Sequence, residues 1–172
     1  MDWTLFWTAF GAIGTTTATL ITAIAVVIAV KQYKQPLTKK VKITLGTAFP
    51  IMADSSVGET LYQITVANCG IRPLVLSNVY MQVNKKNIAF ELQRYAAYLK
   101  MPMPKFPHTL NPEEAAVFYL PYSLLSAGMK EVICLHKIPP GSKVNILVTD
   151  QAGGEHRLKT KLNIGQIAKD HG

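Results

Sequence analysis

Residues Trp3–Val30 read WTLFWTAFGAIGTTTATLITAIAVVIAV, and these 28 residues include no Asp, Glu, Lys, Arg or His. As an α-helix, with a rise of about 1.5 Å per residue, the stretch would be about 42 Å long. The hydrocarbon core of a bilayer is about 30 Å thick, so the stretch is long enough to cross it. Buried helices of soluble proteins seldom run so long without a charge, and Met1-Asp2 lack the positive charge of a secretory signal peptide. We therefore expect residues 1–31 to form a permanent, single transmembrane helix.

The charges after this helix predict its orientation. The end of the helix and a neck at residues 32–42 carry five lysines and no acid: Lys31, Lys34, Lys39, Lys40 and Lys42. Lysine-rich flanks stay on the cytoplasmic side, so we expect the N-terminus outside and the rest of the chain in the cytoplasm. The same lysines are expected to contact the lipid bilayer, each contributing about 1 kcal/mol near an anionic surface. Pro36 is expected to end the helix.

Small and hydroxyl side chains repeat every four residues along the expected helix. The residues that we expect to pack against a neighbouring helix are Gly11, Gly14, Thr15, Ala18, Thr19 and Thr22. Small residues let two backbones approach closely, and threonine hydroxyls can hydrogen-bond between helices, so the pattern predicts a homo-oligomer. Two other interpretations stay open. Each hydroxyl can bond to a carbonyl of its own helix, or the threonines can line an aqueous pore.

The remainder of the chain has the size of one domain, and its periodicity is mainly that of β-strands. Strands are expected at 41–49, 61–67, 74–83, 88–92, 115–122, 144–148 and 155–162. Residues 84–87 are expected to form a turn, and 123–137 have helical spacing. About seven short strands with turns between them predict an Ig-like antiparallel β-sandwich over residues 43–165. Residues 166–172 are expected to be a tail or part of a short helix.

Residues 93–114 interrupt the strand pattern. Residues 93–99 allow one or two helical turns, whereas the four prolines between 102 and 112 predict an extended loop without regular structure. Large apolar side chains accompany this loop: Tyr95, Tyr98, Met101, Met103 and Phe106. They are expected either to close the open end of the sandwich or to form a lip for a partner or the membrane.

The chain carries a net charge of +8, and five of its positive charges lie at the neck. Residues 43–172 hold 13 Lys and Arg against nine Asp and Glu. No basic cluster interleaved with aromatic residues stands out, so DNA is not expected as a partner.

No residue pattern typical of catalysis or metal binding is found. Glu113, Glu114 and Asp150 fall in expected turns, where such residues serve the backbone. Cys134 and His136 lack further ligands at zinc spacing, so neither a metal nor a cofactor is expected. In the cytoplasm, Cys69 and Cys134 are expected to be free thiols. We expect a protein that is not an enzyme.

Two strings of residues carry a resemblance: Val66-Ala67-Asn68-Cys69-Gly70-Ile71-Arg72-Pro73 and Val148-Thr149-Asp150-Gln151-Ala152-Gly153. With a lysine-rich turn after the first, they look like small bacterial and phage-associated single-pass membrane proteins with a cytosolic β-sandwich. The resemblance implies a place in the bacterial inner membrane, with the C-terminal domain in the cytoplasm. Its residues belong to turns and strands, so it adds little about activity.

The arrangement also resembles membrane effectors of bacterial antiviral systems, including those gated by cyclic nucleotides or oligoadenylates. This predicts an oligomer whose β domain senses a ligand, such as a nucleotide, and acts on the membrane through its helices. The residues expected to receive phosphates are Arg72, Lys85, Lys86, Arg94, Lys100 and Lys105. The alternative is a constitutive membrane anchor that holds a cytosolic partner protein.

Overall fold

A computed structural model describes residues 2–34, 39–51 and 56–169. Contacts divide the chain into two units, Met1–Thr38 and Lys39–Gly172, which are described separately.

The first unit is helix α1, Trp3–Lys34, and every side chain described in it is exposed. Its segment Gly14–Tyr33, with a mean hydropathy of 1.6, is long and apolar enough to cross a membrane. The helix continues beyond the expected end at residue 31, so Lys34, which was expected in the neck, belongs to it. Pro36 itself lies outside the described residues.

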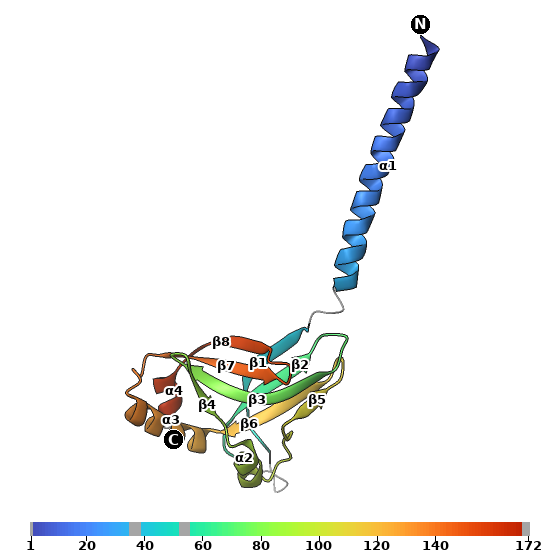
Figure 1. Ribbon diagram of the computed structural model, residues 1–172. Coiled ribbons are helices and arrows are strands. Elements are labelled where there is room, and N and C mark those ends of the chain that lie inside the picture. The colour runs from blue at the N-terminus through green and yellow to red at the C-terminus, as the bar shows by residue number, and fades with distance from the viewer. Residues whose placement is uncertain (1, 35–38, 52–55, 170–172) are drawn as a thin grey trace. The chain divides into compact units, whose positions relative to one another are not determined.

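The second unit contains two antiparallel sheets (Figure 1). The first has the order β1-β2-β6, with β1 at Val41–Ala48, β2 at Leu61–Asn68 and β6 at Ala115–Pro121. The second has the order β4-β3-β7-β8, with β3 at Leu74–Val83, β4 at Lys86–Ala89, β7 at Lys143–Asp150 and β8 at Glu155–Asn163. A short strand, β5 at His108–Leu110, also pairs with β3. The expectation of a mainly β fold with antiparallel sheets is confirmed.

Residues of both sheets share one hydrophobic core. On β2, Ile64 and Val66 are fully buried while the neighbouring Gln63 and Thr65 are only half-buried, as the alternation predicts. Phe118 of β6 and Ile146 of β7 are fully buried in the same core. Burial of each such side chain contributes about 2 kcal/mol, so the alternating positions fix which face of each strand turns inward.

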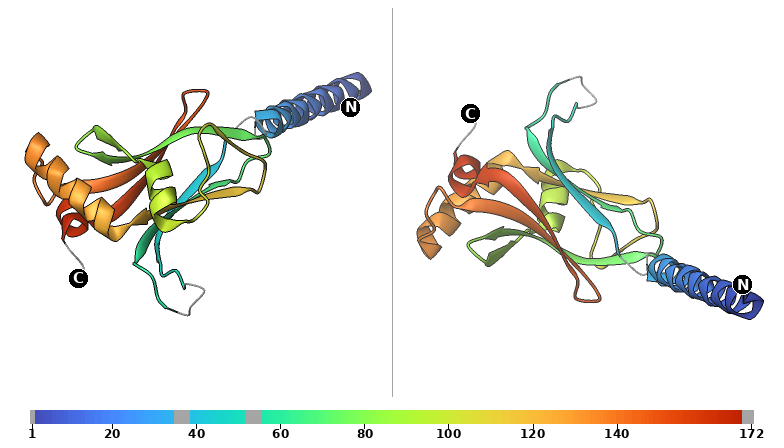
Figure 2. Two further views of the ribbon diagram at one scale, coloured as in Figure 1. Left: turned by 90° about the horizontal axis from the view of Figure 1, so that it is seen from below. Right: turned by 90° about the horizontal axis from the view of Figure 1, so that it is seen from above.

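Three short helices complete the second unit: α2 at Leu92–Leu99, α3 at Tyr122–His136 and α4 at Ile164–Ala168. Helices α3 and α4 lie side by side at one end of the sheets (Figure 2). A capping box between Asn163 and Gln166 begins α4, and Ile167 and Ala168 are buried in the core. Of the two interpretations of residues 166–172, the short helix is the one observed as far as Ala168, where the apolar side chains pack against the core.

Two further expectations need correction. The turn expected at 84–87 is shorter, because Asn84 and Lys85 both have positive φ angles, as in a two-residue hairpin turn, and Lys86 already begins β4. The loop expected at 101–112 contains β5, since the residues of 108–110 are not prolines and keep their N–H groups. Within that loop, Met103 is buried and Phe106 stacks on Phe118, with ring centroids 5.4 Å apart. Phe106 thereby packs against the hydrophobic core.

Candidate functional site

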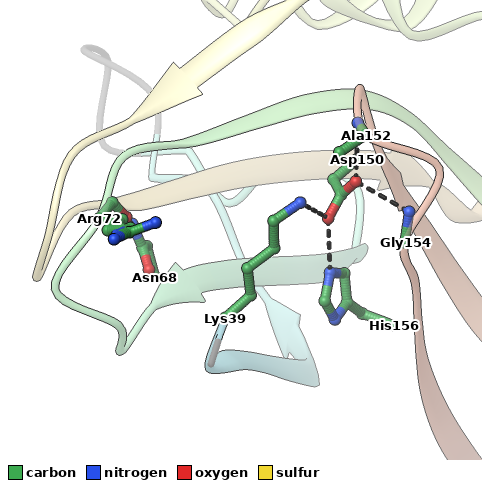
Figure 3. A network of polar contacts seen from close by, with 7 residues as sticks. All are labelled: Lys39, Asn68, Arg72, Asp150, Ala152, Gly154 and His156. Atoms are coloured by element: carbon green, nitrogen blue, oxygen red, sulfur yellow. Dashed lines mark hydrogen bonds and ion pairs between the residues drawn. The ribbon is translucent and has the colours of Figure 1, made fainter. Parts of the chain in front are cut away.

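The carboxylate of Asp150, at the end of β7, has four polar partners among the described residues (Figure 3). Its side chain is 1% exposed. Oδ2 lies 2.7 Å from Nζ of Lys39 and 3.3 Å from Nε2 of His156. Oδ1 accepts hydrogen bonds from the backbone N–H groups of Ala152 at 2.9 Å and Gly154 at 2.8 Å. The turn between β7 and β8 thus wraps around the carboxylate.

The surroundings of Asp150 determine its charge. Burial alone raises the pKa of this carboxyl group, but the hydrogen bonds from Lys39, the Gly154 N–H and His156, together with the charge of Lys39, lower it to about 2. The group is therefore ionised at neutral pH and is not suited to exchange a proton in general acid–base catalysis. A Cβ added at Gly154 would lie 2.6 Å from Oδ2, so the turn needs a glycine there.

Lys39, which was expected to contact lipid, has a carboxylate partner within the domain. Its ammonium group is bound to Asp150, and its side chain is 42% exposed. The pair joins the first residue of the second unit to the β7–β8 hairpin. The sequence predicted the turn at Asp150, but it offered no signal for a partner 111 residues away. Sequence reasoning therefore missed this network.

Asn68 builds the turn between β2 and β3 in a similar way. Its amide Nδ2 donates to the backbone carbonyls of Arg72 at 2.7 Å and Leu110 at 3.0 Å, and its Oδ1 accepts from the N–H of Gly70 at 3.0 Å. Asn68 is 2% exposed. The string that carried the resemblance is therefore a structural turn, and the exposed Arg72 contributes its backbone carbonyl to it.

The six basic residues expected to bind phosphates do not converge. Arg72 precedes β3, whereas Lys85 and Lys86 follow it, and a strand of this length separates its ends by about 30 Å. Lys100 is the residue that follows the last turn of α2, and it has a positive φ angle. Arg94 and Lys105 do line one groove, of about 690 Å³, together with Phe90 and Phe106. Arg94 also pairs there with Glu91 at 3.2 Å.

A second groove lies between β1 and β8, the outer strands of the two sheets, and has a volume of about 710 Å³. Its lining is mostly apolar and comes from Ile43, Thr44, Leu45, Gly46, Thr47, Tyr62, Tyr122, Leu158, Lys159, Thr160, Lys161 and Leu162. We call it the β1–β8 groove. The alternation of the two strands is visible in the sequence, but nothing there indicates that both lie at sheet edges and face a common space.

The residues expected to pack between helices all lie on α1. The hydroxyls of Thr15, Thr19 and Thr22 donate to carbonyls four residues earlier in the same helix, at 3.0, 2.8 and 2.8 Å. These three hydroxyl groups therefore donate within their own helix, which is one of the two alternative interpretations given above. A Cβ added at Gly11 or Gly14 would meet nothing within 4 Å.

The expected lipid contacts other than Lys39 are distributed over both units. Lys31 is exposed on α1, and Lys40 and Lys42 are exposed at the start of the second unit. The side chain of Lys34 lies outside the described residues.

In the part of the chain that the structure describes, no group of three or more His, Cys, Asp or Glu side chains is placed to hold a metal ion. Cys69 and Cys134 are exposed and unbridged. In comparisons with known proteins, no family model matches the chain. No curated protein matches it in sequence either.

Proposed function

We propose that this protein is a non-enzymatic, single-pass membrane anchor whose β domain binds a cytosolic partner and holds it at the inner membrane. The observation that supports this best is the β1–β8 groove, an open and largely apolar surface bounded by two sheet edges. An apolar surface of this kind on a soluble domain is typical of an interaction site. Asp150, by contrast, is saturated by hydrogen bonds and serves to hold the domain together.

We also propose that the domain is Ig-like. The orders β1-β2-β6 and β4-β3-β7-β8 correspond to strands A-B-E and C′-C-F-G of that fold, in chain order. The β1–β8 groove then lies between the first and last strands. The five lysines around residues 31–42 support a cytoplasmic domain, because such flanks are retained inside.

The anchoring role is tested by comparing the full chain with a chain that ends at residue 38. Both are expressed in bacteria, and the cytosolic proteins that co-purify with the membranes are quantified by mass spectrometry. We expect at least one protein to be recovered in stoichiometric amount with the full chain and to be lost with the helix alone. Recovery of the same proteins with both chains would contradict the proposal.

A second function is favoured by one observation, the shared groove of Arg94 and Lys105. Two cations beside aromatic rings suit an anionic ligand such as a nucleotide, and in this function the domain senses it and acts on the membrane through an oligomer of α1. Calorimetry with cyclic dinucleotides and oligoadenylates tests the idea. Binding that is lost in Arg94→Glu and kept in Arg72→Glu would support it, whereas the absence of heat with every nucleotide would contradict it.

A further inference from the structure

The floor of the β1–β8 groove is apolar and close to the core. Leu45 and Leu158 line it from the two edge strands, and Tyr62 stacks on Tyr122 with ring centroids 4.1 Å apart. Burial, followed by the hydrogen bond and charge of Tyr122, raises the pKa of Tyr62. The leucines and the stacked tyrosine rings give the groove a floor that suits apolar side chains.

Both walls of the groove are free sheet edges. Among the described strands, β1 pairs only with β2, and β8 pairs only with β7. The N–H of Cys69 donates to the carbonyl of Lys40, in register with the pairing of Val41 with Asn68. Backbone groups of an antiparallel strand alternate between its two edges, so Ile43, Leu45 and Thr47 direct theirs away from β2. These outward-directed N–H and C=O groups can pair with the backbone of one more strand.

The charges at the groove are of one sign. Lys159 and Lys161 line it from β8, and no Asp or Glu belongs to its lining. Neither lysine has an acidic partner within 4 Å among residues 2–34, 39–51 and 56–169. Lys42 adds a further exposed cation on β1. The same groove edge of a second copy would carry the same lysines and would be repelled at this edge.

We propose that the β1–β8 groove binds an extended segment of another protein in which acidic and apolar residues alternate, and that this segment adds as a strand to the free edge of β1. Its apolar side chains enter the groove beside Leu45 and Leu158. Its acidic side chains point outward, toward the lysines of β8. The inference rests on the proposed anchoring role, since it names the kind of partner that the domain holds.

The first experiment uses the full chain in lipid nanodiscs and a fluorescent peptide that alternates valine with glutamate. Fluorescence anisotropy is expected to report binding, and a peptide that alternates valine with lysine is expected not to bind. In the double variant Lys159→Glu/Lys161→Glu, affinity for the acidic peptide should fall by about tenfold or more. The matched control Lys85→Glu/Lys86→Glu makes the same charge change at the β3–β4 turn and should bind normally. Equal losses in both variants would overturn the proposal.

The second experiment tests the backbone pairing without changing the protein. Two versions of the acidic peptide carry N-methyl groups either on the valines or on the glutamates. Alternate N–H groups of a strand point to opposite edges, so one version should lose binding and the other should keep it. Equal binding of both versions would overturn strand addition.

These results separate the inference from the function on which it rests. If the acidic peptide fails to bind while the full chain still recruits its cytosolic protein, strand addition in the groove is wrong and the anchoring role stands. If recruitment also fails, both are wrong.

Discussion

Asp150 joins parts of the domain that are 111 residues apart in the sequence. Its carboxylate has a pKa of about 2, below its ordinary value of 3.8, so folding favours the ionised form. The stabilisation from this shift, about 2 kcal/mol, is complete above about pH 4 and is lost as the pH falls toward about 2.

We expect Asp150→Asn to lower the free energy of unfolding by about 2 kcal/mol at neutral pH, because the amide can accept the turn's hydrogen bonds but lacks the charge that binds Lys39. The difference from the unaltered chain should shrink as the pH falls from about 4 to about 2. Urea denaturation of the full chain in detergent micelles, at a series of pH values, measures this.

Two lysines provide a matched comparison for that experiment. Lys39→Met should also destabilise the domain, since it leaves a buried carboxylate without its cation. Lys40→Met, next to it and exposed, should change little. Equal effects of the two substitutions would show that the neck lysines act only through overall charge.

Asn68 offers a second test at a single side chain. Asn68→Asp replaces the amide donor with an oxygen that would lie near the carbonyls of Arg72 and Leu110. The lost donors and the repulsion should cost about 2 kcal/mol or more in the free energy of unfolding. The exposed Asn87 accepts a hydrogen bond from Gln82, so Asn87→Asp keeps that interaction and should be nearly neutral. Similar losses for both variants would contradict the role of Asn68.

The elements themselves could largely be predicted from the sequence. Alternation in β2, β3 and β6 reflects burial of about every second residue, and that signal is local. In β7, Ile146, Leu147 and Val148 are all buried. The hairpin at Asn84-Lys85 was placed less well and strand β5 was not predicted, because a two-residue turn and a three-residue strand have too few positions for a periodic pattern.

Helix α1 carries the prediction of self-association. Gly14 has no atom within 4 Å of an added Cβ, so Gly14→Leu can be accommodated in a single helix and should act only on a neighbouring helix. We expect Gly14→Leu and Ala18→Leu to abolish crosslinked oligomers in detergent, because a bulky side chain keeps the backbones apart. Ile24→Leu and Val27→Leu change the volume little and should leave the oligomers intact. Oligomers that persist in all four variants would leave α1 as a simple anchor.

The way in which the strands of the domain pair could be predicted from the sequence less well than the strands themselves. Which strands pair, and which remain at the edges, depends on contacts between distant segments such as β1 and β8. The basic residues illustrate this: six were expected to bind phosphates, and in the described part of the chain Arg94 and Lys105 share a groove while Arg72 lies at the opposite end of β3 from Lys85 and Lys86. The same long-range pairing places Lys39 on Asp150, for which no local pattern exists.

The orientation of the chain across the membrane can be tested with its own cysteines. Cys69 and Cys134 are both exposed and both belong to the second unit, so each can report which side of the membrane that unit occupies. With the lysine-rich flank inside, an impermeant maleimide should label both thiols in inverted inner-membrane vesicles and neither in intact spheroplasts. The variant Cys69→Ser/Cys134→Ser controls for background labelling. Labelling in spheroplasts would reverse the orientation. Labelling that appears only after reduction would indicate a disulfide between the two cysteines, which belongs to an oxidising compartment and not to the cytoplasm.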